Sequence, residues 1–203
     1  MNLVLEVGDG EVHVWVVRLP GTDAASARPA RDALARLVAR YASEARLEHR
    51  AGRRPTVHGA PLHVSLARSG ELALVAVAAG TEVGVDLERV VPAPPSAVVS
   101  HLLSDDEAEA LRELAASERD VAFARAWVRK EAALKAAGVG LAVEPPLVEV
   151  GVEASLPRRV AVPGHGTVVV ADLEVVPDHA AAVAVSGSAH PVVRVRRTSS
   201  TVR

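Results

Sequence analysis

DVAFARAWVRKEAALKAAG, residues 120–138, is the stretch that decides the fold, because it is the strongest helix pattern in the chain. At about 100° per residue its apolar side chains fall on one stripe, formed by Phe123, Ala126, Trp127, Leu134 and Ala137. Gly138 and Gly140 then follow at the place where glycine commonly ends a helix. The sequence therefore predicts a long helix over residues 120–138 with one face on the core.

Lys130 lies in the middle of this apolar stripe, and Glu131 lies at its border with Lys135 one turn further on. Lysine is almost never fully buried unless its ammonium group has a partner. One interpretation is a snorkelling lysine beside a helix-stabilising Glu131–Lys135 pair. The other interpretation is that these charged groups belong to a functional site.

VGVDLE, residues 83–88, is predicted to be a strand. Because side chains alternate along a strand, Gly84, Asp86 and Glu88 share one face, with the two acidic residues roughly 7 Å apart. A solvated edge strand would explain two such acids. If the strand packs against the helix, they would instead join Glu131 as three hard oxygen ligands, the kind that Mg²⁺ prefers.

The remaining elements are predicted from alternation, helical periodicity and turn residues. They are a hairpin over residues 3–17 turning at Gly8–Gly10, a helix over 29–42, a hairpin over 62–78 turning at 68–70, a helix over 103–116, and a strand-rich stretch over 158–187. Ser104 and Glu107 form the pattern of a capping box at the start of the fourth element.

Composition narrows the class of protein. The 203 residues are 49% hydrophobic and include no cysteine, which excludes disulfides and thiolate metal sites. A net charge of −2 gives no reason to expect a nucleic-acid partner. The sequence shows neither a signal peptide nor an apolar run of about 18 residues that could span a membrane. These features predict a cytoplasmic protein with no membrane partner.

Three motifs together resemble a known family. GVDLE at 84–88, LSDDE at 103–107 and WVRKEAALKAAGVGL at 127–141 occur in the order and spacing of the 4′-phosphopantetheinyl transferase superfamily, two-domain Sfp-like type. That family carries G-[IV]-D-[IVL]-E, then F-S-x-x-E, then W-[TS]-x-K-E-[AS]-x-x-K-x-x-G-x-G-[LF]. The resemblance implies transfer of the phosphopantetheine arm of coenzyme A to a serine of an apo acyl or peptidyl carrier protein.

The resemblance also implies roles for single residues. Asp86, Glu88 and Glu131 match the acids that hold Mg²⁺ on the pyrophosphate of coenzyme A. Lys135 matches the lysine that contacts the phosphate in the transition state. Lys130 belongs to the same helix motif, and the resemblance implies that it contacts coenzyme A.

Glu107 has two competing interpretations. It matches the carboxylate proposed to deprotonate the serine of the carrier protein. As the third residue of a helix with a capping box, its carboxylate would instead fold back to Ser104. The sequence does not separate these roles.

The sequence departs from the family where the nucleotide end of coenzyme A is expected. Arg54 stands in the place of a family lysine and can serve as a phosphate contact. The family motif F-N-x-S-H-S appears as residues 62–67, where Ser65 is kept but Leu66 replaces the histidine expected to contact the 3′-phosphate.

We expect a mixed α+β fold of two similar subdomains with mainly antiparallel sheets, related by pseudo-twofold symmetry. An echo between ARSGELALVAVAAG and VPDHAAAVAVSG, each ending in an alternating Ala/Val strand, suggests the two halves. The expected boundaries are 1–90 for a shortened N-terminal subdomain, 91–190 for a C-terminal subdomain and 191–203 for a basic, flexible tail.

Two other functions stay open: a non-catalytic relative that binds coenzyme A or a carrier protein, and an enzyme of the same fold with another pyrophosphate substrate. Arg119, Arg125 and Arg129 are either a solvated face or a basic patch for an acidic carrier protein.

Overall fold

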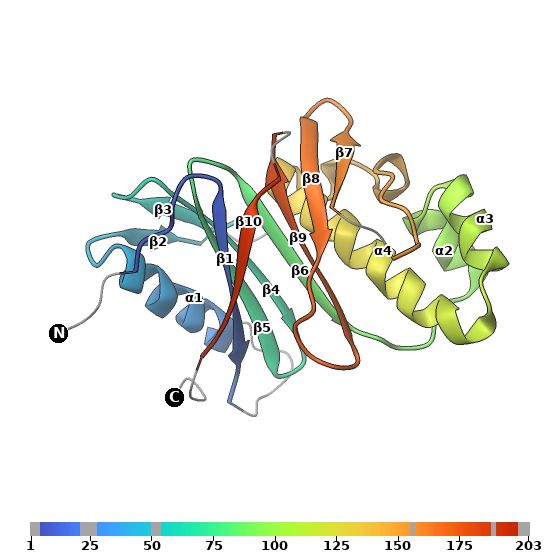
Figure 1. Ribbon diagram of the computed structural model, residues 1–203, viewed down its shortest axis with the longest axis horizontal. Helices are drawn as coiled ribbons and strands as arrows, with labels where there is room; N and C mark the ends of the chain where they lie inside the picture. The colour runs from blue at the N-terminus through green and yellow to red at the C-terminus, as the bar shows by residue number, and fades with distance from the viewer. Residues whose placement is uncertain (1–4, 21–27, 50–53, 155–156, 188–189, 199–203) are drawn as a thin grey trace.

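The computed structural model describes residues 5–20, 28–49, 54–154, 157–187 and 190–198 and has a mixed α+β fold (Figure 1). In chain order its elements are β1 (Glu11–Arg18), α1 (Arg28–Tyr41), β2 (Arg46–Glu48), β3 (Thr56–His58), β4 (Leu62–Ser69), β5 (Leu72–Ala79), β6 (Val83–Arg89), α2 (Ser96–Leu102), α3 (Asp105–Glu113), α4 (Ala116–Ala137), the 3-10 turns η1 (Gly140–Ala142) and η2 (Pro145–Leu147), β7 (Arg158–Val162), β8 (Gly166–Asp172), β9 (His179–Ser186) and β10 (Val192–Arg197).

The first sheet has the strand order β10-β1-β5-β4, and α1 covers one of its faces. Strands β1, β5 and β4 pair antiparallel, whereas β10 pairs parallel to β1. Alternation along the strands sends every second side chain toward the helix. This face packs on α1 through side chains such as Trp15, Val75, Leu34 and Val38.

The second sheet has the order β6-β9-β8-β7, is antiparallel throughout and is covered by α4. Gly138 ends α4 in the left-handed conformation, with φ of 72°, which glycine adopts without steric cost. Side chains of β8 and β9 on this face, including Val168 and Ala182, pack against α4.

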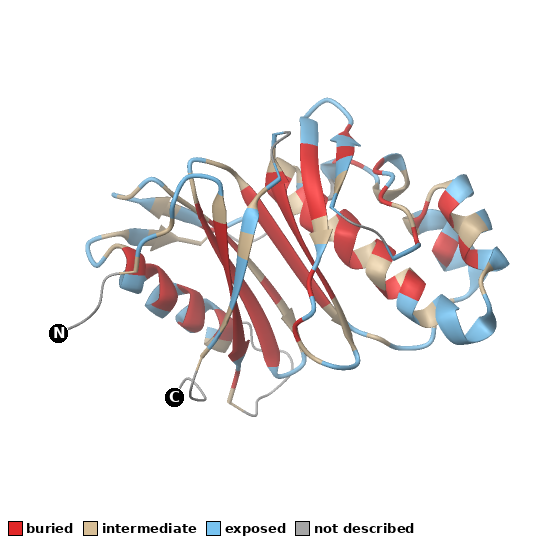
Figure 2. Cartoon of the chain, viewed as in Figure 1, coloured by how far each residue is buried: buried red, intermediate tan, exposed pale blue. Residues whose placement is uncertain are grey.

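The other faces of the two sheets share one apolar core. Val14 and Leu74 of the first sheet belong to the same buried cluster as Val85 and Val183 of the second. Figure 2 shows these buried strands at the centre of the molecule, and Figure 1 shows α1 and α4 on opposite sides of the pair of sheets. No helix in the described ranges is long and apolar enough to cross a bilayer.

Most predicted elements are confirmed. The helices over 29–42 and 120–138 are present as α1 and α4, although α4 begins four residues earlier than predicted. The hairpin over 62–78 is present as β4 and β5. The capping box is present, with Ser104 as the N-cap of α3.

Two predictions at the ends of the chain are wrong. The hairpin over residues 3–17 is absent from its described part, because β1 begins at Glu11 and pairs with β5 and β10 instead; residues 1–4 lie outside the described residues. In the tail, which the sequence predicted to be flexible, residues 192–197 form β10, while 199–203 lie outside the described residues.

The subdomain boundary near residue 90 and the pseudo-twofold relation stay predictions. The pairing does show that β6, from the predicted N-terminal subdomain, is hydrogen-bonded to β9 in the second sheet. Strand β4 of the first sheet also contacts β6. A side chain of β4 bonds to the backbone of β6, since Ser65 Oγ accepts from the backbone nitrogen of Val85 at 3.0 Å. The motif strand β6 therefore lies where the two sheets meet.

Candidate active site

Gly84 lets helix α4 approach strand β6 closely. A methyl group at this position would collide with the carbonyl oxygen of Ala132 and would lie 2.5 Å from the backbone nitrogen of Ala136. Backbone atoms cannot turn aside as a side chain can, so only glycine fits here. The room left by this glycine is filled by α4, which carries Glu131 and Lys135 toward the acids of β6.

Asp86 forms an ion pair with Lys135. The carboxylate is buried, with the residue 6% exposed, and Lys135 Nζ lies 2.6 Å from Asp86 Oδ1 and 3.2 Å from the carbonyl oxygen of Val85. Asp86 Oδ2 is also buried and has no hydrogen-bond partner among the described residues. Such an atom costs about 1–3 kcal/mol, so it marks a place where a ligand or ion would be favourable.

Glu88 and Glu131 complete a group of three acids. Burial and then the negative charge of Asp86 raise the pKa of Glu88, although Ser69 Oγ donates to its carboxylate at 3.1 Å. Burial raises the pKa of Glu131, where the attraction of Lys135 opposes the repulsion of the two acids on β6. A cation placed among these carboxylates would relieve that repulsion.

The donors fit Mg²⁺ chemically but do not yet surround a cation. Within the described ranges no three His, Asp or Glu side chains lie in an arrangement that holds a metal ion. Three carboxylates are the hard oxygen donors that Mg²⁺ takes together with water and phosphate oxygens. Asp86, Glu88 and Glu131 are the residues that would hold the ion, and their side chains would have to come together to do so.

A cavity of about 720 Å³ adjoins this group. Its walls come from the ends of β2 and β3, from β4 and from the C-terminal part of α4, and they are lined by His49, Arg54, Pro55, Thr56, Ser65, Leu66, Glu131, Lys135, Gly138, Val139 and Gly140. Four predicted site residues therefore share one cavity. His49 and Thr56 were not predicted to be site residues. The one indication in the sequence was that both lie close to Arg54 along the chain.

A second cavity, of about 610 Å³, lies between the N-terminal half of α4 and the segment that joins β8 to β9. It is lined by Val121, Arg125, Ala154, Asp172 and residues 173–177 and 179–181. None of the predicted site residues lines it.

Arg54 is held at the cavity wall by Glu82. Its Nη1 and Nη2 lie 2.6 and 2.7 Å from the two oxygens of that carboxylate. The guanidinium group also faces Gly138, where a methyl group would come within 3.2 Å of it. Arg53, the neighbour that the family motif also covers, lies outside the described residues.

Glu107 and Lys130 form a separate, buried ion pair. Lys130 is 0% exposed, and its ammonium donates to Glu107 Oε2 at 2.5 Å and to the carbonyl oxygens of Val148 and Pro145 at 2.6 and 3.0 Å. Burial alone would raise the pKa of Glu107, but the charge of Lys130 and backbone donors outweigh it, so this pKa lies below its usual value.

Both oxygens of Glu107 are already engaged. Oε2 also accepts from the backbone nitrogen of Ser104 at 3.0 Å, and Oε1 accepts from those of Val150 and Gly151 at 2.7 and 2.9 Å. The structure therefore does not bring Glu107 and Lys130 to the acids of β6. We assign both a structural role, in place of the predicted base and the predicted coenzyme A contact.

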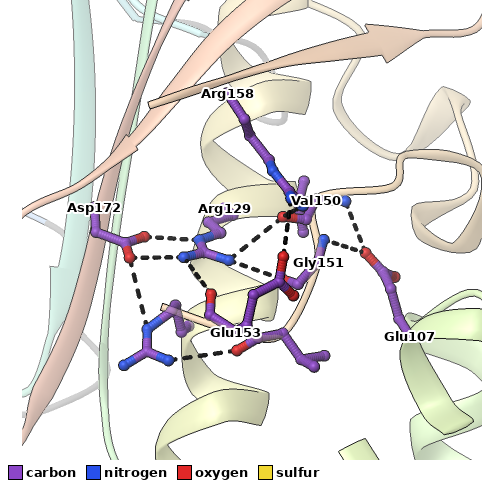
Figure 3. A network of polar contacts seen from close by, with 9 residues as sticks. Glu107, Arg129, Val150, Gly151, Glu153, Arg158 and Asp172 are labelled. Carbon is purple, nitrogen blue, oxygen red and sulfur yellow. Dashed lines mark hydrogen bonds and ion pairs between the residues drawn. The ribbon is translucent and has the colours of Figure 1, made fainter. Parts of the chain in front are cut away.

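Arg129 extends this structural network (Figure 3). It is 2% exposed and donates to both carboxylate oxygens of Asp172 at 2.7 Å. It also donates to the carbonyl oxygens of Gly151 and Glu153, each at 2.9 Å. Two consecutive cations of α4, Arg129 and Lys130, thus fix the segment before β7 against the helix.

The predicted basic patch for an acidic partner is not supported. Arg129 is buried, and Arg125 lies 3.6 Å from the carboxylate of Asp172. Arg119 donates to the carbonyl oxygens of Leu114 and Arg112 at 3.0 and 2.8 Å. All three guanidinium groups are therefore used within the chain.

Removing Lys130 should destabilise the fold. In Lys130→Met the carboxylate of Glu107 loses its buried countercharge, so we expect a loss of about 3–5 kcal/mol in the free energy of unfolding, measured in urea. The double variant Lys130→Met/Glu107→Gln should regain much of this loss, because the buried charge is gone. Arg112→Met, which removes a cation of α3 from an ion pair with Glu109 whose two side chains are more than half exposed, is the control and should unfold near the wild type. A stable Lys130→Met protein would contradict the structural role.

The comparisons with known proteins support one family. The family model for the 4′-phosphopantetheinyl transferase superfamily matches residues 82–184, which include β6, α3, α4 and part of β9. No curated protein matches the chain. Since the family model covers just over half of the sequence, the chain belongs to the 4′-phosphopantetheinyl transferase superfamily.

Proposed function

We propose that the protein transfers the 4′-phosphopantetheine arm of coenzyme A to a serine hydroxyl of an apo acyl or peptidyl carrier protein. The second product is adenosine 3′,5′-bisphosphate, and the reaction depends on Mg²⁺. The family supports phosphopantetheinyl transfer in general. The residues that we assign to the reaction are Asp86, Glu88, Glu131 and Lys135.

One observation carries this proposal: Asp86 Oδ2 is buried beside Lys135 without a hydrogen-bond partner among the described residues, in a group of three mutually repelling acids. A fold gains nothing in stability from such a group, because like charges repel and a buried polar atom without a partner is costly. Functional sites are where such costs are expected. A cation and a diphosphate together would satisfy both the acids and the lysine.

The chemistry requires charge neutralisation more than covalent help from the protein. The serine oxygen attacks the phosphorus that carries the pantetheine arm, and the bond from that phosphorus to the bridging oxygen of the pyrophosphate breaks. The electron pair and negative charge go to the leaving bisphosphate. Mg²⁺ held by Asp86, Glu88 and Glu131 would supply charge neutralisation on the pyrophosphate. Lys135, beside Asp86 and lining the cavity, places a positive charge where the negative charge develops.

The serine proton must go to an acceptor near the cavity. We do not assign this role to Glu107, because its carboxylate already accepts from Lys130 and from the backbone nitrogens of Ser104, Val150 and Gly151. Glu88 and Glu131 are assigned to Mg²⁺, so in this proposal a water molecule of the cavity takes the proton.

Transfer can be tested by intact-protein mass spectrometry. An apo acyl carrier protein is incubated with coenzyme A, MgCl₂ and the protein, and a transferase of known activity serves as the positive control. We expect the carrier to gain one phosphopantetheine group. A carrier modified only in the positive control would contradict the proposal; coenzyme A binding in that case would favour a non-catalytic relative, and its absence another pyrophosphate substrate.

A further inference from the structure

His49 has a buried ring nitrogen for which the described part of the chain provides no partner. The residue directly follows β2 and lines the cavity of about 720 Å³. Its Nδ1 is inaccessible to solvent and has no hydrogen-bond partner among the described residues. Buried polar atoms in folded proteins are nearly always bonded, and an exception calls for an explanation such as a ligand. His49 also lies outside the residues matched by the family model.

The neighbours of His49 in this cavity are suited to an anion. Arg54 and Thr56, from the other side of the β2–β3 hairpin, add a guanidinium group and a hydroxyl to the same wall. Arg54 is paired with Glu82, but the two side chains are 38% and 34% exposed. Ion pairs so exposed are weak, so the guanidinium group can turn to a phosphate, which it binds in bidentate fashion.

The residues that line this wall of the cavity favour a phosphate group over an adenine ring. Apart from the imidazole of His49, the lining residues in the described part of the chain include no aromatic ring on which an adenine could stack. Among the described residues, the cavity has one other cation, Lys135, which is engaged at Asp86, so the group at His49 is a second and separate set of donors. Coenzyme A carries two separate phosphate groups: the pyrophosphate and the monoester on its ribose.

We propose that His49, together with Arg54, binds the ribose 3′-phosphate of coenzyme A and replaces the histidine that the family motif has at the position of Leu66. The inference rests on the proposed function for the identity of the ligand. Leu66 lines the same cavity but offers no donor. His49, beside β2, therefore supplies the imidazole that β4 lacks at Leu66.

Calorimetric titration of the full chain with coenzyme A and with 3′-dephospho-coenzyme A tests this role. We expect the wild type to prefer coenzyme A, and His49→Ala to bind coenzyme A about ten- to hundredfold more weakly while its affinity for the dephospho form stays unchanged. His49→Phe, which keeps a ring but has no nitrogen donor, should behave in the same way. His58→Ala is the matched control, since His58 is exposed on β3 and does not line the cavity.

The outcomes separate this inference from the proposed function. Equal losses for both ligands in His49→Ala, or no loss for either, would overturn the role of His49 while leaving the transferase proposal intact. A wild type that binds both ligands equally would also overturn it. Failure of the wild type to bind coenzyme A at all would overturn the proposed function itself. Thermal unfolding of each variant confirms that the losses are not due to misfolding.

Discussion

The Asp86→Asn variant is expected to lose phosphopantetheine transfer by about 10²–10³-fold without losing stability. Asparagine keeps the shape of the side chain but removes the charge that faces Lys135 and the cation site. Because Asp86 repels Glu88 and Glu131, its neutralisation also relieves a cost that the native fold carries. The transfer rate is followed by carrier mass, and stability by urea unfolding.

Asp32→Asn is the matched control for this variant. It makes the same change of charge on α1, where Asp32 is 55% exposed and paired only weakly with Arg28. Transfer by this control should equal that of the wild type. If Asp86→Asn keeps its rate, or loses it by unfolding, then Asp86 does not have the role assigned to it.

The Gly84→Ala variant is expected to lose about 3 kcal/mol or more of its free energy of unfolding. Overpacking typically costs about 1–3 kcal/mol, and the added methyl group here would meet backbone atoms of Ala132 and Ala136, which cannot change rotamer. Helix α4 would have to move away from β6, which would also separate Lys135 from Asp86. Urea unfolding measures the first effect and the transfer rate the second.

Gly8→Ala provides the comparison for Gly84→Ala. Gly8 does not have a positive φ, and a methyl group there would meet its nearest neighbour, Glu11, at an ordinary 3.5 Å. We expect this variant to keep wild-type stability. A Gly84→Ala protein as stable as Gly8→Ala would show that the approach of α4 to β6 is not as close as described.

The central elements could be predicted because their sequences are strongly periodic. The stripe of α4 and the alternation of β6 each follow one period, and both are present in the structure. The convergence of Asp86 with Lys135 could not be derived from either element alone. It depends on Gly84, whose missing side chain sets how closely the helix approaches the strand.

Glu107 and Lys130 show why motif positions did not determine roles. Both lie in motifs of the family, and that likeness implied roles in the reaction beside the structural alternatives that the sequence left open. The backbone amides of Val150 and Gly151 and the carbonyl oxygen of Val148, which hold these side chains, come from a segment about 20 residues further along the chain than Lys130. The capping-box pattern did predict the bond between Glu107 and Ser104, but no local pattern indicates the contacts to this later segment.

The ends of the chain were mispredicted for a related reason. Residues 192–197 read as a basic tail, yet they form a parallel strand whose partner, β1, lies near the start of the sequence. Arg194 of this strand donates to Glu11 at 2.7 Å. Parallel pairing between residues so far apart leaves no turn signal of the kind that identified the hairpin of β4 and β5.

A calorimetric titration of Mg²⁺ into the protein in the presence of coenzyme A tests the central claim most directly. We expect the wild type to bind a single Mg²⁺, and Glu131→Gln to bind it at least about tenfold more weakly while remaining folded. Glu131 is suited to this test because it joins the acids of β6 from helix α4 and lines the cavity. Equal Mg²⁺ affinity in the two proteins would contradict the assignment of Asp86, Glu88 and Glu131 as a metal site.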